Sequence, residues 1–125
     1  MMFSCRKHRA EFNPMSKLQD ALNQIKDPTV ADAKTQFEQL INEGKAASEA
    51  FIQSSAQQLE QWTIDVSEKK MSQDEFDNLV SSQAILAKNF VASQALAAQE
   101  RAEKLTIKTA ELAATKIVPI LIAAI

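Results

Sequence analysis

The chain of 125 residues contains a single glycine, Gly44, and only three prolines. Tight turns, hairpins and sheet corners depend on these two residue types, because few others adopt the backbone angles required there. Ala, Gln, Leu, Glu and Lys, which favour helices, supply much of the remaining sequence. We therefore predict an all-α fold, formed by a single domain over 15–125.

Apolar residues follow one another by threes and fours from Val30 to Val66. This is the spacing of one helix face, and it predicts a helix over about 28–67. No internal capping signal interrupts the stretch, so we expect a continuous helix that packs along a partner. A shorter helix is predicted over about 16–26, with an apolar face formed by Leu18, Leu22 and Ile25.

The second long helix has the clearest start signal in the chain. Ser72 and Glu75 have the spacing of a capping box, and Pro119 cannot donate the backbone hydrogen bond that would continue a helix. These signals predict a helix over about 72–118. The residues at 67–70 are all polar and predict a short turn, so the two long helices should form an antiparallel hairpin.

The apolar faces of the two long helices predict the core of this hairpin. It consists of Phe37, Gly44, Phe51, Leu59, Trp62, Phe76, Leu79, Phe90, Ala97, Leu105 and Leu112. The register gives three facing pairs, Phe51 with Phe90, Gly44 with Ala97, and Trp62 with Leu79. Because Gly44 and Ala97 are small, we expect the two backbones to approach closely at that layer.

A second apolar ridge is predicted on the 72–118 helix. Ile85, Leu96, Ile107 and Val118 recur at intervals of eleven residues, which keeps them close to one line of a straight helix. A two-helix hairpin cannot bury both sides of one helix, so another surface should cover the ridge. We expect a second copy of the chain there. The short helix over 16–26 is the alternative, but it is too short to cover the whole line.

An apolar tail ends the sequence. It includes Ile117, Ile120, Leu121, Ile122 and Ile125, with no charged residue after Lys116. Crossing a bilayer takes about 20 apolar residues, so the tail is too short to span a membrane. Two interpretations remain open: the tail is buried in protein, or it contacts lipid or another apolar surface.

Residues 1–14 form a basic arm without helical periodicity, which we expect to be disordered. Met15 begins the amphipathic pattern and is an alternative translation start, in which case the arm is not translated. Cys5 and His8, the only cysteine and histidine, lie in this arm, so one chain cannot form a disulfide framework, a zinc site or a catalytic triad. No apolar run follows the basic residues, so we expect a cytoplasmic protein, with a peripheral membrane location as the alternative.

The sequence contains no recognisable catalytic, cofactor-binding or metal-binding pattern. Asp74, Glu75 and Asp77 fall in the first turn of a predicted helix, where the helix dipole favours acids. No Gly-rich phosphate loop is present, and a net charge of -2 argues against nucleic acid as a partner. We therefore expect no enzymatic activity, no cofactor and no small-molecule substrate.

Two functions remain. The first is a self-associating helical protein, most simply a homo-oligomer, that acts as an assembly subunit or scaffold. The second is an amphipathic protein that coats or inserts into a membrane or another apolar surface through its C-terminal segment. A lipid-granule coat protein, or phasin, has a similar size and a similar Ala- and Gln-rich helical composition, but no motif in this chain carries that likeness.

Overall fold

The computed structural model describes residues 14–125, and within this range every regular element is helical. The all-α prediction is confirmed, whereas the basic arm with Cys5 and His8 lies outside the described residues. The helices are α2 (Pro14–Asn23), α3 (Ala31–Lys45), α4 (Ala50–Ser67), α5 (Gln73–Ala92), α6 (Leu96–Glu103), α7 (Thr109–Leu112) and α8 (Val118–Ala124). A 3-10 turn (Pro28–Val30) precedes α3, and two π-helical segments (Lys104–Lys108 and Ala113–Ile117) join α6, α7 and α8 into one C-terminal helix.

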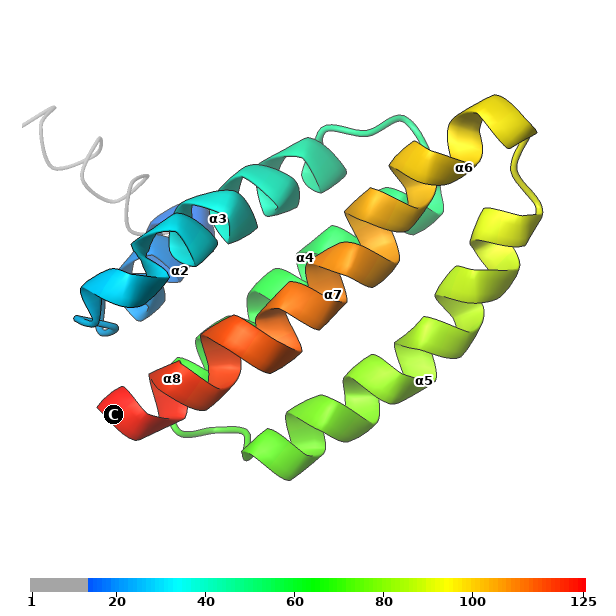
Figure 1. The fold of residues 1–125 in the computed structure, drawn as a ribbon. Coiled ribbons are helices and arrows are strands. Elements are labelled where there is room, and N and C mark those ends of the chain that lie inside the picture. The colour runs from blue at the N-terminus through cyan, green and yellow to red at the C-terminus, as the bar shows by residue number, and fades with distance from the viewer. Residues whose placement is uncertain (1–13) are drawn as a thin grey trace, which may run out of the picture.

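Successive helices run back and forth along one axis (Figure 1). The C-terminal helix lies between α3 and α5 and crosses in front of α4, and it contacts all three. Helix α2 packs mainly on α4. The molecule is therefore a bundle of antiparallel helices in which the C-terminal helix is the central member, rather than a single long hairpin.

The predicted helix over 28–67 is wrong in its continuity. The chain leaves the helix at Ala46 and starts α4 after Glu49, whose backbone is extended, so α3 and α4 form a hairpin of their own. Gly44 lies in the last turn of α3, and a Cβ built on it would lie only 2.7 Å from the Cβ of Ala56 on α4. The missing side chain lets the two helices pack closely, which favours the fold-back over an extended rod.

The predicted helix over 72–118 is also divided, at 93–95. The Ser93 hydroxyl donates a hydrogen bond to the Phe90 carbonyl (2.6 Å), which competes with the helical backbone pattern, and Ala95 is extended. The helix that follows does not stop at Pro119. This proline lies in the first turn of α8, directly after a π-helical segment, where its missing N–H does not interrupt a regular α-helix.

The turn between α4 and α5 matches its prediction. The Glu75 N–H donates to the Ser72 hydroxyl (3.2 Å), and the Ser72 N–H donates to the Glu75 carboxylate (3.0 Å), so the capping box is formed. These bonds satisfy backbone donors at the start of α5. They fix the point at which α5 turns back against α4.

The apolar tail lies inside the bundle. Ile117 and Leu121 are fully buried, whereas Ile120, Ile122 and Ile125 are half-buried. They share one core cluster with the three α2 residues Leu18, Leu22 and Ile25, whose predicted common face is confirmed. Helix α2 itself begins at Pro14, two residues before its predicted start. Of the five tail residues, the structure buries Ile117 and Leu121 in protein and leaves the other three partly exposed.

We expect the change Gly44→Ala to destabilise the fold. Overpacking costs about 1 to 3 kcal/mol, and the higher helix propensity of Ala offsets about 1 kcal/mol of this. The double change Gly44→Ala with Ala56→Gly removes the clash and should recover most of the loss, as measured by urea unfolding. Purely additive effects of the two changes would show that these positions do not touch.

Candidate functional site

The ridge predicted from Ile85, Leu96, Ile107 and Val118 does not exist as one line. Because the chain reverses at 93–95, Ile85 lies on α5 and the other three lie on the C-terminal helix. Val118 is fully buried and Ile107 is half-buried. Ile85 and Leu96 are exposed, at 65% and 85% of their surface, but they sit on different helices. The predicted self-association surface is therefore wrong in its geometry.

The predicted hairpin core also divides into two groups. Five of its members are buried, namely Phe37, Gly44, Leu59, Phe76 and Leu105. Four are half-buried, namely Phe51, Trp62, Phe90 and Leu112, while Leu79 and Ala97 are exposed. The predicted pair of Gly44 with Ala97 is wrong, because Gly44 faces Ala56 once α3 folds back on α4.

Aromatic side chains join α4 to α5. The rings of Phe51 and Phe90 stack as predicted, with centroids 4.8 Å apart and planes 23° from parallel. Near the other end of the pair of helices, Trp62 meets the edge of Phe76, with ring centroids 6.5 Å apart, rather than facing Leu79. Three of these four rings remain half-exposed, so the seam between α4 and α5 is also a surface.

A hydrogen bond lies between the two aromatic contacts. The Gln83 side-chain amide on α5 donates to the Ser55 hydroxyl on α4, at 2.7 Å. Both groups are neutral, and the bond satisfies them where the two helices meet. The seam is thus held by aromatic packing and one neutral polar contact.

Two leucines of α5 extend this surface. Leu79 lies three residues after Phe76 and Leu86 four residues before Phe90, so both share the side of α5 that packs on α4. They are 37% and 55% exposed. We call the surface formed by Phe51, Trp62, Leu79, Leu86 and Phe90 the α4–α5 face.

The α4–α5 face carries no charge along most of its length, and Asp65 and Glu75 border it only at the end near Trp62 and Leu79. Between residues 50 and 64 the only charged residue is Glu60, whose side chain is 4% exposed and accepts hydrogen bonds from the Lys45 ammonium on α3 at 3.0 and 3.2 Å. Between 78 and 99 the only charged residue is Lys88, which lines a crevice between α5 and the C-terminal helix. Both charges therefore point away from the face.

The charges gather on another side of the bundle. Arg101 donates to the Glu49 carboxylate at 3.0 Å, and Lys104 lies 3.4 Å from the carboxylate of Glu43. The backbone amide of Glu49 itself and the Arg101 guanidinium hold the pKa of this carboxyl below its usual range. These ion pairs link the α3–α4 region to the C-terminal helix and do not involve the residues of the α4–α5 face.

Sequence reasoning missed Leu86, which lies next to the predicted Ile85 but points to the α4 side of α5. The available signal was the charge pattern, since residues 78–99 hold one charge in a chain that is 24% charged. An amphipathic surface helix ordinarily has charges on its solvent side. Their absence marks a helix with an unusual outer surface.

We expect the Phe51–Phe90 stack to contribute a measurable coupling energy. Each Ala variant should cost less than the about 3 to 5 kcal/mol typical of a fully buried Phe, because both rings are half-exposed. The double variant should cost less than the sum by about 0.5 to 1.5 kcal/mol. Phe51→Ala combined with Trp62→Ala is the control, because about 16 Å of helix separates these residues. Urea unfolding of the wild type, the three single variants and the two double variants measures both pairs, and additive losses in the Phe51–Phe90 pair would refute the contact.

Familiar chemistry and known relatives do not identify the site. Within residues 14–125 no group of three or more His, Cys, Asp or Glu side chains is placed to hold a metal ion. None of the helices described there is long and apolar enough to cross a membrane. No family model, curated protein or solved structure matches the chain. The function has to be argued from the surface itself.

Proposed function

We propose that this protein is a non-enzymatic, self-associating helical protein whose copies pair through the α4–α5 face and so act as assembly subunits. The observation that carries the proposal is the uncharged surface with two exposed leucines and three half-exposed aromatic rings. Aromatic residues are enriched, and charged residues depleted, at the centre of protein interfaces. Isolated apolar residues on a surface are common, but five of them along one seam between two helices are not.

A second copy of the chain is the occupant that this chemistry favours. A twofold axis brings the same patch of each copy together, so a charge close to the axis would lie near the same charge of the other copy and repel it. The middle of the α4–α5 face avoids this repulsion because Glu60 and Lys88 point elsewhere. A partner of opposite charge would need a charged surface, which this face does not offer.

The spacing along α5 also suits such a pairing. If two α5 helices cross antiparallel midway between Ser82 and Gln83, Leu79 of one copy lies opposite Leu86 of the other, on both sides of the axis. Ser82 is small and exposed, so the helices can approach at the crossing point. The half-exposed Trp62 and Phe90 would flank the two leucine pairs.

Coating of an apolar surface through the C-terminal segment has less support. Ile117 and Leu121, which such a segment would present to lipid, are fully buried against α2 and its neighbours. Presenting them would require α8 to leave the core. We therefore place the interaction on the α4–α5 face rather than on residues 117–125.

We expect the double change Leu79→Glu with Leu86→Glu to weaken self-association at least tenfold, because it buries like charges against each other at the axis. Ile85→Glu is the matched control, since Ile85 lies on the same helix and is more exposed but faces away from α4. Gel filtration with light scattering over a range of concentrations measures the mass. Emission from Trp62, the only tryptophan, should shift to shorter wavelength as the wild type associates.

Three outcomes count against the proposal. A full-length wild type that stays monomeric at high micromolar concentration contradicts self-association. If Ile85→Glu dissociates the protein as strongly as the double change does, the interface lies elsewhere on α5. Loss of helical circular dichroism in the double variant would place the two leucines in the core instead.

A further inference from the structure

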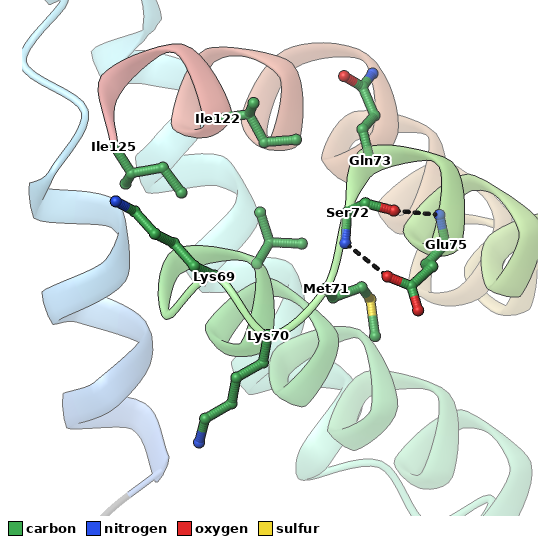
Figure 2. Close-up of a pocket in the computed structure, with 9 residues that line it drawn as sticks. Lys69, Lys70, Met71, Ser72, Gln73, Glu75, Ile122 and Ile125 are labelled. Atoms are coloured by element: carbon green, nitrogen blue, oxygen red, sulfur yellow. Dashed lines mark hydrogen bonds between the residues drawn. The ribbon is translucent and has the colours of Figure 1, made fainter.

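A cavity of about 430 Å³ lies at the end of the bundle where the α4–α5 turn meets α8 (Figure 2). Its size is within the about 300 to 1,000 Å³ typical of small-molecule sites. The residues that line it are Val66, Lys69, Lys70, Met71, Ser72, Gln73, Glu75, Ile122 and Ile125. No part of the proposed function uses this cavity.

The cavity combines an apolar wall with a basic rim. Val66 is fully buried at its base, and Met71 and Ile122 are half-buried beside it. Figure 2 shows the Lys69 side chain extending toward Ile125 at the edge of the cavity, whereas the Lys70 side chain points away. The Lys70 ammonium is engaged elsewhere, 3.1 Å from the Glu68 carboxylate.

Two groups of the rim, Ser72 and Glu75, are hydrogen-bonded to each other, and Glu75 keeps its negative charge. The Glu75 carboxylate accepts the Ser72 N–H, and the Ser72 hydroxyl accepts the Glu75 N–H, as dashed lines in Figure 2 show. None of the ion pairs found among residues 14–125 involves Lys69. Among the charged residues that line the cavity, Lys69 is therefore the cation that is outside these ion pairs.

The backbone of Lys69 is strained. Its φ is 64°, in the left-handed region, and it is the only non-glycine residue with positive φ among the described residues. The strain comes from the end of α4, where the Lys70 N–H donates to the Asp65 carbonyl (2.8 Å) and the Lys69 N–H to the Val66 carbonyl (3.0 Å). This is a Schellman motif, in which glycine normally occupies the left-handed position. The chain carries a lysine where glycine would be more stable. Residues with such backbone strain cluster at binding sites.

We propose that this cavity binds an amphipathic monocarboxylate, a free fatty-acid-like molecule. Its alkyl chain lies on Met71 and Ile122, and its carboxylate pairs with the Lys69 ammonium. A cation at the edge of an apolar wall complements this ligand class, because the ion pair forms next to the region where the chain displaces water. The site is separate from the α4–α5 face and does not depend on self-association.

Decanoate is the probe, titrated into the full-length protein by isothermal calorimetry. We expect saturable binding that Lys69→Met weakens at least fivefold, while the matched control Lys70→Met changes it less than twofold. Decanol, which has the same chain without the charge, should bind at least fivefold more weakly than decanoate. Ile122→Ala, which shortens the apolar wall, should weaken both ligands.

Lys69→Gly separates binding from folding. It relieves the left-handed strain, so it should raise the urea midpoint of unfolding while weakening decanoate at least fivefold. A merely structural role for Lys69 predicts no loss of binding in this more stable variant. Repeating the titration in the Leu79→Glu, Leu86→Glu background should give the same affinity, so failure of one proposal is distinguishable from failure of the other.

Several results would overturn the proposal. Unchanged affinity in Lys69→Met, or equal affinity for decanol, would show that the cavity does not select a carboxylate. Absence of saturable decanoate binding, combined with flotation of the protein on phosphatidylglycerol vesicles, would assign this end of the bundle to a membrane surface instead.

Discussion

The close contact between Gly44 and Ala56 is the constraint on which the rest of the bundle depends. It lets α3 lie directly against α4, and this brings Lys45 within 3.0 Å of Glu60, so that the only charge in residues 50–64 is neutralised on the inner side of α4. On the other side of α4, Phe51 and Trp62 contact aromatic rings of α5, and Ser55 accepts a hydrogen bond from Gln83, so that these contacts involve neutral groups. The central place of the C-terminal helix follows, because α3, α4 and α5 together leave one groove for it.

How far the sequence predicted this fold depended on whether a signal was local. The capping box at Ser72 and Glu75 and the polar turn before it involve neighbouring residues, and both were predicted correctly. The loop at 46–49 was missed because the apolar pattern continues in phase across it: Ile41, Ile52 and Leu59 would lie on almost one line of a straight helix. Periodicity reports which face is apolar, but not whether the helix folds back on itself. That choice is made by tertiary packing at Gly44.

The candidate site shows the same division. Phe51 and Phe90 were paired correctly, because both lie on helices joined by the correctly predicted turn. The predicted ridge of Ile85, Leu96, Ile107 and Val118 was wrong because it required one uninterrupted helix. The chain reversal at 93–95 contains no Gly or Pro from which it could have been predicted. Leu86 became visible only when the side of α5 that faces α4 was known. Burial of Ile117 and Leu121 likewise depends on a core cluster that α8 shares with α2, which no local pattern encodes.

The two π-helical segments make the C-terminal helix tolerant of a change in length at two places. A π-helical turn holds one residue more than an α-helical turn, so Lys104–Lys108 and Ala113–Ile117 each take up an extra residue without changing the rotation of the helix beyond them. Loss of one residue from either segment restores a regular α-helical turn and keeps Leu121 on its buried side. Loss of one residue from the regular α-helix α6 would instead turn everything downstream by about 100° and bring Leu121 out of the core. Single-residue deletions should therefore be tolerated better inside the two π-helical segments than in α6.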